Sequence, residues 1–155
     1  MAKRLAGDWL STYLAYTENT EPPNSYHVWT AISVIASALQ RKVWLNWGHE
    51  SIYPNMYIVL IGPSGRCRKG TAMNIGKRLL VAIKDVTITA ESVTREALIR
   101  LMKGAINNMT DPRHPSRITV HCSITVISEE LAVFLGQNDV RFLSNLTDWY
   151  DSRDK

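Results

Sequence analysis

Near the middle of the chain an uninterrupted apolar run leads into a glycine-containing loop that ends in a lysine and a threonine. The run covers residues 57–61, and the loop reads Gly62-Pro63-Ser64-Gly65-Arg66-Cys67-Arg68-Lys69-Gly70-Thr71. A short, continuous apolar run is typical of a strand buried on both faces of a parallel sheet. When such a strand is followed by a glycine-containing loop and a helix, backbone N–H groups and the helix N-terminus point toward a bound phosphate. This feature constrains the fold more than any other in the sequence.

The loop departs from the usual phosphate-loop pattern G-x-x-x-x-G-K-[ST]. Lys69 lies seven residues after Gly62 instead of six, and Gly70 separates Lys69 from Thr71. We interpret the loop as nucleotide-binding, with Lys69 directed at the β- and γ-phosphates and the Thr71 hydroxyl a ligand of Mg²⁺. In a register without the extra residue, Arg68 takes the lysine position, and the simpler alternative is a Gly/Pro turn without function. The remaining candidate nucleotide-binding residues are Gly62, Pro63, Ser64, Gly65 and Gly70.

A second informative site follows the apolar residues 124–127, where Ser128 precedes Glu129 and Glu130. In phosphate-loop NTPases an acid at the end of a buried strand orients Mg²⁺, and a neighbouring acid polarises the attacking water. We expect Glu129 and Glu130 to be the catalytic acids and Glu129 also to be a metal ligand, although spacing does not separate the two roles. Alternatively, both glutamates simply begin a helix, whose dipole favours acids there. Because both motifs follow apolar strands in the right order, together they favour the catalytic interpretation.

Hydrophobic periodicity predicts the other elements. We expect helices over residues 8–16, 24–40, 71–83, 131–135 and 142–149, and one from Ser92 or Thr94 to Met102. Strands are expected over residues 43–47, 86–89 and 118–127, and an exposed loop over residues 107–117, which contain two prolines. Three of the tryptophans suit a base-stacking surface, but their spacing favours packing in the core; these are Trp29, Trp44 and Trp47.

The order of elements predicts an α/β fold, a three-layer P-loop NTPase core with a mostly parallel sheet. We assign residues 53–155 to this core and residues 1–52 to a helical segment that precedes it. The 155 residues are 45% hydrophobic and 21% charged, which is typical of an ordinary globular domain. The net charge of +4 is compatible with a nucleic-acid partner without requiring one. Residues 28–39 are too short and polar to span a bilayer, so we expect no membrane partner and a cytoplasmic location.

The loop residues also resemble a known family. Residues 53–57, leading into Gly62-Pro63-Ser64-Gly65 and Arg68-Lys69-Gly70-Thr71-Ala72, look like the phosphate loop of phage-type primase-helicase proteins, the DUF3987-like P-loop ATPases. Further matches are residues 17–23, 29–41, 128–131 and 146–151, so the resemblance covers nearly the whole chain. Its motifs are moderately specific, since the Arg-Lys-Gly-Thr form is unusual among phosphate loops.

The resemblance implies a RecA-like or AAA-like ATPase core that uses ATP and Mg²⁺ and acts on DNA, expected to be single-stranded, during replication. It also implies a homo-oligomer or association with other replication proteins, in the host cytoplasm if the protein is viral. Such ATPases need a polar sensor and an arginine beyond Glu130, so we expect the N-terminal part of a longer ATPase, incomplete at its C-terminus. The sequence predicts an ATPase and does not determine whether this chain hydrolyses ATP by itself. Two alternatives stay open: a non-hydrolysing DNA-binding, assembly or regulatory module with a degenerate loop, and a small P-loop phosphotransferase.

Overall fold

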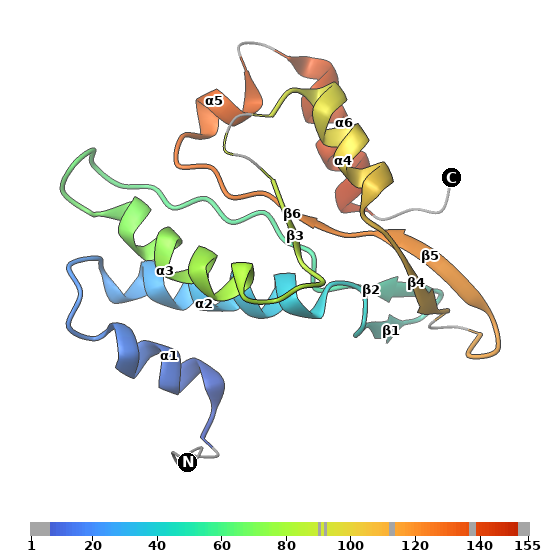
Figure 1. Ribbon diagram of the computed structural model, residues 1–155, viewed down its shortest axis with the longest axis horizontal. Helices are drawn as coiled ribbons and strands as arrows, with labels where there is room; N and C mark the ends of the chain where they lie inside the picture. The colour runs from blue at the N-terminus through green and yellow to red at the C-terminus, as the bar shows by residue number, and fades with distance from the viewer. Residues whose placement is uncertain (1–6, 90, 92, 112–113, 137–138, 152–155) are drawn as a thin grey trace.

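A computed structural model describes residues 7–89, 91, 93–111, 114–136 and 139–151. In Figure 1 three helices occupy the lower left, three more lie on the upper side, and two antiparallel strand pairs extend to the right. The lower helices are α1 (Trp9–Thr17), α2 (Asn24–Leu39) and α3 (Lys69–Val81). The upper helices are α4 (Arg95–Gly104), α5 (Leu131–Leu135) and α6 (Val140–Tyr150).

The predicted helices are all present, with ends shifted by a few residues. Asp8 caps α1 by accepting from the backbone N–H groups of Leu10 and Ser11, and Thr94 caps α4 by accepting from Ala97. Side-chain oxygens in this position satisfy N–H groups that have no partner inside the helix. Ser92, the other predicted start of α4, lies outside the described residues.

The main helical contact joins α2 to α3. Gly76 of α3 lies directly against α2, where an added β-carbon would be 2.5 Å from a Thr30 methyl carbon and 3.0 Å from one of Val34. Ala31 and Val34 on α2 and Leu80 on α3 are buried at this contact side of the helices. The close approach fixes the start of α3, and therefore the end of the glycine-containing loop, relative to α2.

The described strands form three two-stranded sheets. β3 (Thr87–Ile88) and β6 (Ile124–Thr125) are parallel, with Thr87 opposite Ile124. The other two pairs are antiparallel: β1 (Leu45–Trp47) with β2 (Glu50–Ile52), and β4 (Ile106–Thr110) with β5 (Ile118–Cys122). The chain is therefore a mixed helix and strand protein with one parallel pair, which confirms the coarse fold class. The single, mostly parallel sheet of the sequence prediction is not among the sheets of the described residues.

The predicted strand at residues 57–61 is wrong in its pairing and its burial. These residues are extended but form no strand, and Val59 and Ile61 are 52% and 83% exposed. Side-chain hydrogen bonds to other elements hold the segment instead: the Tyr57 hydroxyl donates to the Leu146 carbonyl at 2.6 Å, and the Tyr26 hydroxyl donates to the Ile61 carbonyl at 2.7 Å. Because alternate side chains of an extended chain face opposite ways, only Ile58 and Leu60 are half-buried.

Two other predictions are also wrong. Residues 106–110, of which 107–110 were expected to lie in an exposed loop, form β4, because pairing with β5 supplies partners that local composition does not reveal. Trp29, Trp44 and Trp47 do not pack in the core; all three are exposed on the surface. The division of the chain near residue 52 stays a prediction.

Candidate phosphate-binding site

The glycine-containing loop turns directly into the first turn of α3. Gly65 has a φ of +74° and Arg68, at the N-cap of α3, has a φ of +46°, so the chain adopts the left-handed conformation twice within the loop. The Arg68 side chain makes no capping bond to the helix. Backbone N–H groups in the first turn of a helix have no acceptor within it, and they attract anions.

Gly62 fits closely between two side chains. A β-carbon at this position would overlap the Tyr26 hydroxyl oxygen and lie 3.1 Å from Cys67 Sγ. Burial and a hydrogen bond to Cys67 raise the pKa of the Tyr26 phenol, which therefore stays protonated as the donor to Ile61. A residue with a side chain cannot occupy position 62 without breaking this arrangement.

Lys69 closes the loop. Its Nζ donates to the Gly62 carbonyl oxygen at 2.7 Å, which joins the motif's lysine to its first glycine. The bond holds an ammonium group at the loop, close to the N-terminus of α3. A phosphate at the helix N-terminus can replace the Gly62 carbonyl as acceptor, since an anion is the stronger partner for an ammonium.

Arg68 is also held in place, but by an acid. Its Nε lies 2.6 Å from Glu21 Oε2, and both side chains are largely exposed. Glu21 belongs to the connection between α1 and α2, so this ion pair links the loop to the N-terminal helices. Exposed pairs of this kind are worth about 0–1 kcal/mol, and a phosphate can compete for the guanidinium.

The structure brings Glu129 to the loop. A β-carbon at Gly70 would lie 3.1 Å from Glu129 Oε1 and 3.3 Å from Oε2, so the carboxylate rests on the first turn of α3. Asn74, one turn further along α3, donates from Nδ2 to Glu129 Oε1 at 3.2 Å. The two sequence motifs therefore meet, with Glu129 beside the residue that separates Lys69 from Thr71.

Glu130 has a different position. It occupies the N-cap of α5, its side chain makes no capping bond there, and its backbone carbonyl accepts from Ser128 Oγ at 3.0 Å. This agrees with the simpler alternative in which a glutamate begins the helix. Of the two predicted acids, Glu129 is the one that contacts the loop region.

The predicted metal ligands are compatible with Mg²⁺ chemistry. Thr71 follows Gly70 in the first turn of α3 and is exposed, as is Glu129. Mg²⁺ prefers oxygen ligands and retains several waters, so one hydroxyl, one carboxylate and phosphate oxygens are a suitable set. Among the described residues there is no group of three or more His, Cys, Asp or Glu side chains that could bind a metal without such help.

Sequence reasoning missed three residues of this site: Glu21, Tyr26 and Asn74. Tyr26 and Glu21 precede the loop by some forty residues. Glu21 lies in the segment 17–23 that carries the resemblance, but neither residue had a signal that assigned it to the loop. Asn74 had a usable signal, because it lies one turn after Gly70 on a predicted helix and so shares its face. A polar residue at that spacing is a reasonable candidate to contact the carboxylate.

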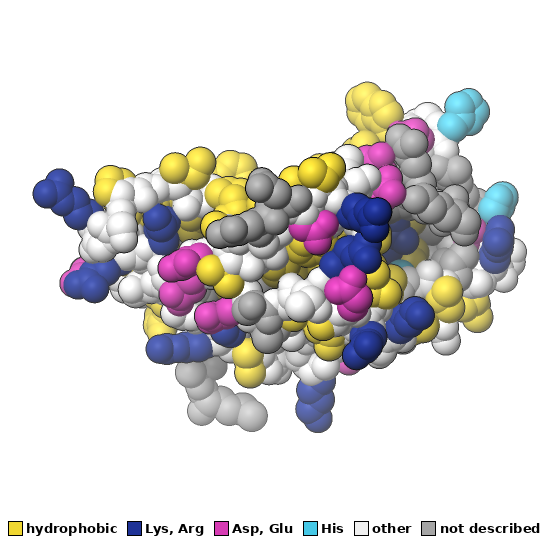
Figure 2. Space-filling view, turned by 90° about the horizontal axis from the view of Figure 1, so that it is seen from above, with side chains coloured by type: hydrophobic (Ala, Val, Ile, Leu, Met, Phe, Trp, Pro, Cys, Tyr) yellow, Lys and Arg dark blue, Asp and Glu magenta, His cyan; other side chains and the backbone are white. Residues whose placement is uncertain are grey.

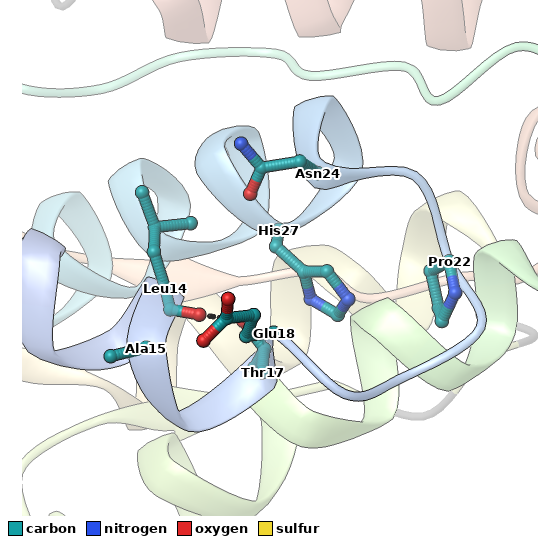
Figure 3. A pocket seen from close by; sticks show the side chains of 7 residues that line it. All are labelled: Leu14, Ala15, Thr17, Glu18, Pro22, Asn24 and His27. Carbon is teal, nitrogen blue, oxygen red and sulfur yellow. Dashed lines mark hydrogen bonds between the residues drawn. The ribbon is translucent and has the colours of Figure 1, made fainter.

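A small cavity lies next to the site, at the turn between α1 and α2 (Figure 3). Its volume is about 330 Å³, and the His27 imidazole projects from α2 toward the connecting loop that carries Pro22. His27 Nε2 is 2.7 Å from Thr20 Oγ1, and burial lowers the pKa of the imidazole. His27 is therefore a neutral, hydrogen-bonded group in the packing of this turn.

Comparisons with known proteins do not assign this site to a family. The chain matches no protein-family model, no curated protein and no solved structure. Within the described residues, no helix has the length and apolar character needed to cross a bilayer.

Proposed function

We propose that the loop from Gly62 to Thr71 binds ATP with Mg²⁺ and that the chain is the ATP-binding module of a helicase-type P-loop ATPase. The observation that carries the proposal is the contact of the Glu129 carboxylate with Gly70, between Lys69 and Thr71. The dipole of α3 by itself favours an acid at the first turn, but the contact also places the carboxylate next to the residue that separates Lys69 from Thr71. An ATPase needs one there, to position Mg²⁺ and the attacking water.

ATP supplies a phosphoryl group whose transfer to water releases free energy. For this reaction Lys69 moves its Nζ from the Gly62 carbonyl to the β- and γ-phosphates, and the N–H groups at the start of α3 bind the same anion. When Mg²⁺ is bound, the Thr71 hydroxyl and Glu129 would be its protein ligands, and a Glu129 oxygen would orient the attacking water. Asn74 fixes the Glu129 carboxylate through its hydrogen bond to Oε1.

The resemblance to phage-type primase-helicases gives the wider proposal. In that context the module acts in DNA replication, on single-stranded DNA, as part of an oligomer of this chain or with other replication proteins. The corresponding fold is a RecA-like or AAA-like core. In such a core the parallel pair of β3 and β6 would be part of a larger parallel sheet.

The metal ligands give the sharpest test of this function. A fluorescent ATP analogue should bind the parent chain more tightly with Mg²⁺ than with a chelator, and Thr71→Val, which keeps the shape but removes the hydroxyl, should lose that difference. Glu129→Gln should also lose the difference between Mg²⁺ and chelator. Glu130→Gln, its matched control, should keep it, because the atoms nearest a β-carbon at Gly70 all belong to Glu129. Analogue binding that is the same with Mg²⁺ and with chelator in the parent would contradict the proposal.

A further inference from the structure

Residues that follow the C-terminal end of α2 and residues of the hairpin β4–β5 line a polar groove. Figure 1 shows these elements away from the glycine-containing loop, toward the other end of the molecule. The volume of the groove is about 510 Å³, within the range of roughly 300–1,000 Å³ that is usual for ligand sites. The lining residues used below are Arg41, Lys42, Trp44, Asp85, Asn107 and His121. The proposed ATPase chemistry uses none of them.

Two cations stand at one side of the groove. Arg41 Cζ lies 4.1 Å from the centroid of the Tyr53 ring, and Lys42 Nζ lies 3.8 Å from Asp85 Oδ2. Both members of the Lys42–Asp85 pair are more than half exposed, so this bond is weak and a phosphate oxygen can compete with it. The groove therefore offers two cations, one stacked on Tyr53 and one in a weak pair with Asp85, that phosphate oxygens can reach.

The chain is held in an unusual conformation just before these cations. Gln40 has a φ of +51°, and its Nε2 donates to the Asp85 carbonyl at 2.6 Å. A non-glycine residue with positive φ is energetically unfavourable, and such strain persists where surrounding contacts impose it. Here it directs Arg41 and Lys42 away from the axis of α2 and toward the groove.

Trp44 supplies a flat apolar wall that is 37% exposed. His121 also lines the groove; it is only 6% exposed, and its Nδ1 is 2.9 Å from Ser123 Oγ. Burial lowers the pKa of His121, and the charges of Arg41 and Lys42 lower it further, so the imidazole is neutral at neutral pH. Asn107 pairs with His121 across the hairpin, which places an amide with donor and acceptor atoms next to the ring.

We propose that this groove binds single-stranded nucleic acid, with one unpaired base on Trp44 and the adjoining phosphates on Arg41 and Lys42. Base stacking on aromatic rings combined with cations along the backbone is the usual chemistry of single-strand binding. A duplex does not suit it, because paired bases already stack on each other. Positive charge alone does not distinguish this groove from the rest of the surface. Figure 2 shows other Lys and Arg side chains, intermixed with acids, on the face that it draws.

The groove gives a binding site to the single-stranded partner named in the proposed function and rests on that function for its occupant. It does not require nucleotide binding, so its test omits ATP and can fail or succeed separately from the test of the loop. Fluorescence anisotropy with a labelled oligothymidylate of about twenty nucleotides should show binding that weakens steeply as salt rises. Trp44→Ala should weaken binding about tenfold, the size expected for loss of one stacked base, and Trp44→Phe should restore most of it. Lys42→Ala should lower the affinity and reduce the slope of its salt dependence by about one. The corresponding oligouridylate distinguishes DNA from RNA as the strand bound.

The matched control is Trp47→Ala, which removes a tryptophan that is 68% exposed and does not line the groove. Circular dichroism establishes that each variant is folded. Equal loss in Trp44→Ala and Trp47→Ala would overturn the proposal, as would equal affinity for a duplex of the same length or unchanged binding in Trp44→Ala.

Discussion

The Glu129 carboxylate rests on the α-carbon of Gly70, so that a β-carbon at position 70 would be 3.1 Å from Oε1. Gly70 is the residue that makes this loop irregular as a phosphate-binding motif. The contact suggests a reason for the irregularity: a glycine there lets an acid from the connection between β6 and α5 approach the start of α3.

Gly70→Ala should separate binding from folding. The added methyl group displaces the flexible end of Glu129, and alanine favours a helix over glycine by about 1 kcal/mol. We expect urea unfolding to show equal or slightly higher stability, while affinity for an ATP analogue with Mg²⁺ falls. If the free energy of unfolding fell by as much as the free energy of analogue binding, Gly70 would be needed only for packing.

Gly62→Ala should destabilise the chain by about 1–3 kcal/mol, because its methyl group overlaps the Tyr26 hydroxyl. Tyr26→Phe removes that oxygen and its hydrogen bond to Ile61, at a cost of about 1 kcal/mol. The double variant should lose less stability than the sum of the two single losses, because the overlap with the Tyr26 oxygen is gone. Strictly additive losses in urea denaturation would show that Tyr26 is not the group Gly62 accommodates.

Gly76→Ala tests the contact between α2 and α3. The new methyl group has no room against Thr30 and Val34, and we expect a loss of about 1–3 kcal/mol in the free energy of unfolding. Gly104→Ala is the control, because nothing lies within 4 Å of a β-carbon at that position in α4. It should leave stability unchanged or raise it by up to about 1 kcal/mol. Similar effects of the two substitutions would mean that α2 and α3 do not pack in this way.

Stability should fall in mild acid. Burial lowers the pKa of His27, so below about pH 6.5 the unfolded chain binds more protons than the folded one. The contribution of neutral His27 is fully present above that pH and is lost as the pH decreases. His121 acts in the same direction, so His27→Gln should reduce the slope of stability against pH without abolishing it. An unchanged slope, matching the exposed control His49→Gln, would exclude His27 as a source.

The helices could be predicted because their apolar residues recur at helical spacing, and polar caps mark the starts of α1, α4 and α6. The meeting of Glu129 with the loop followed from the order of the two motifs. The contacts of Tyr26 and Glu21 could not be predicted, since they depend on how α2 packs against α3. β4 was missed because its asparagines disfavour a strand until β5 pairs with them. Residues 57–61 have the composition of a buried strand, but in this structure they have no strand partner.

The central claim is that Lys69 and the start of α3 bind the phosphates of ATP. An equilibrium titration of a fluorescent ATP analogue in the presence of Mg²⁺ tests it most directly, with parent, Lys69→Ala and Lys77→Ala compared. Lys77 is the control because it lies on the same helix and pairs with Glu91 instead of approaching the loop. The account predicts saturable binding by the parent and by Lys77→Ala, and none by Lys69→Ala. Equal affinity of Lys69→Ala and the parent would contradict it.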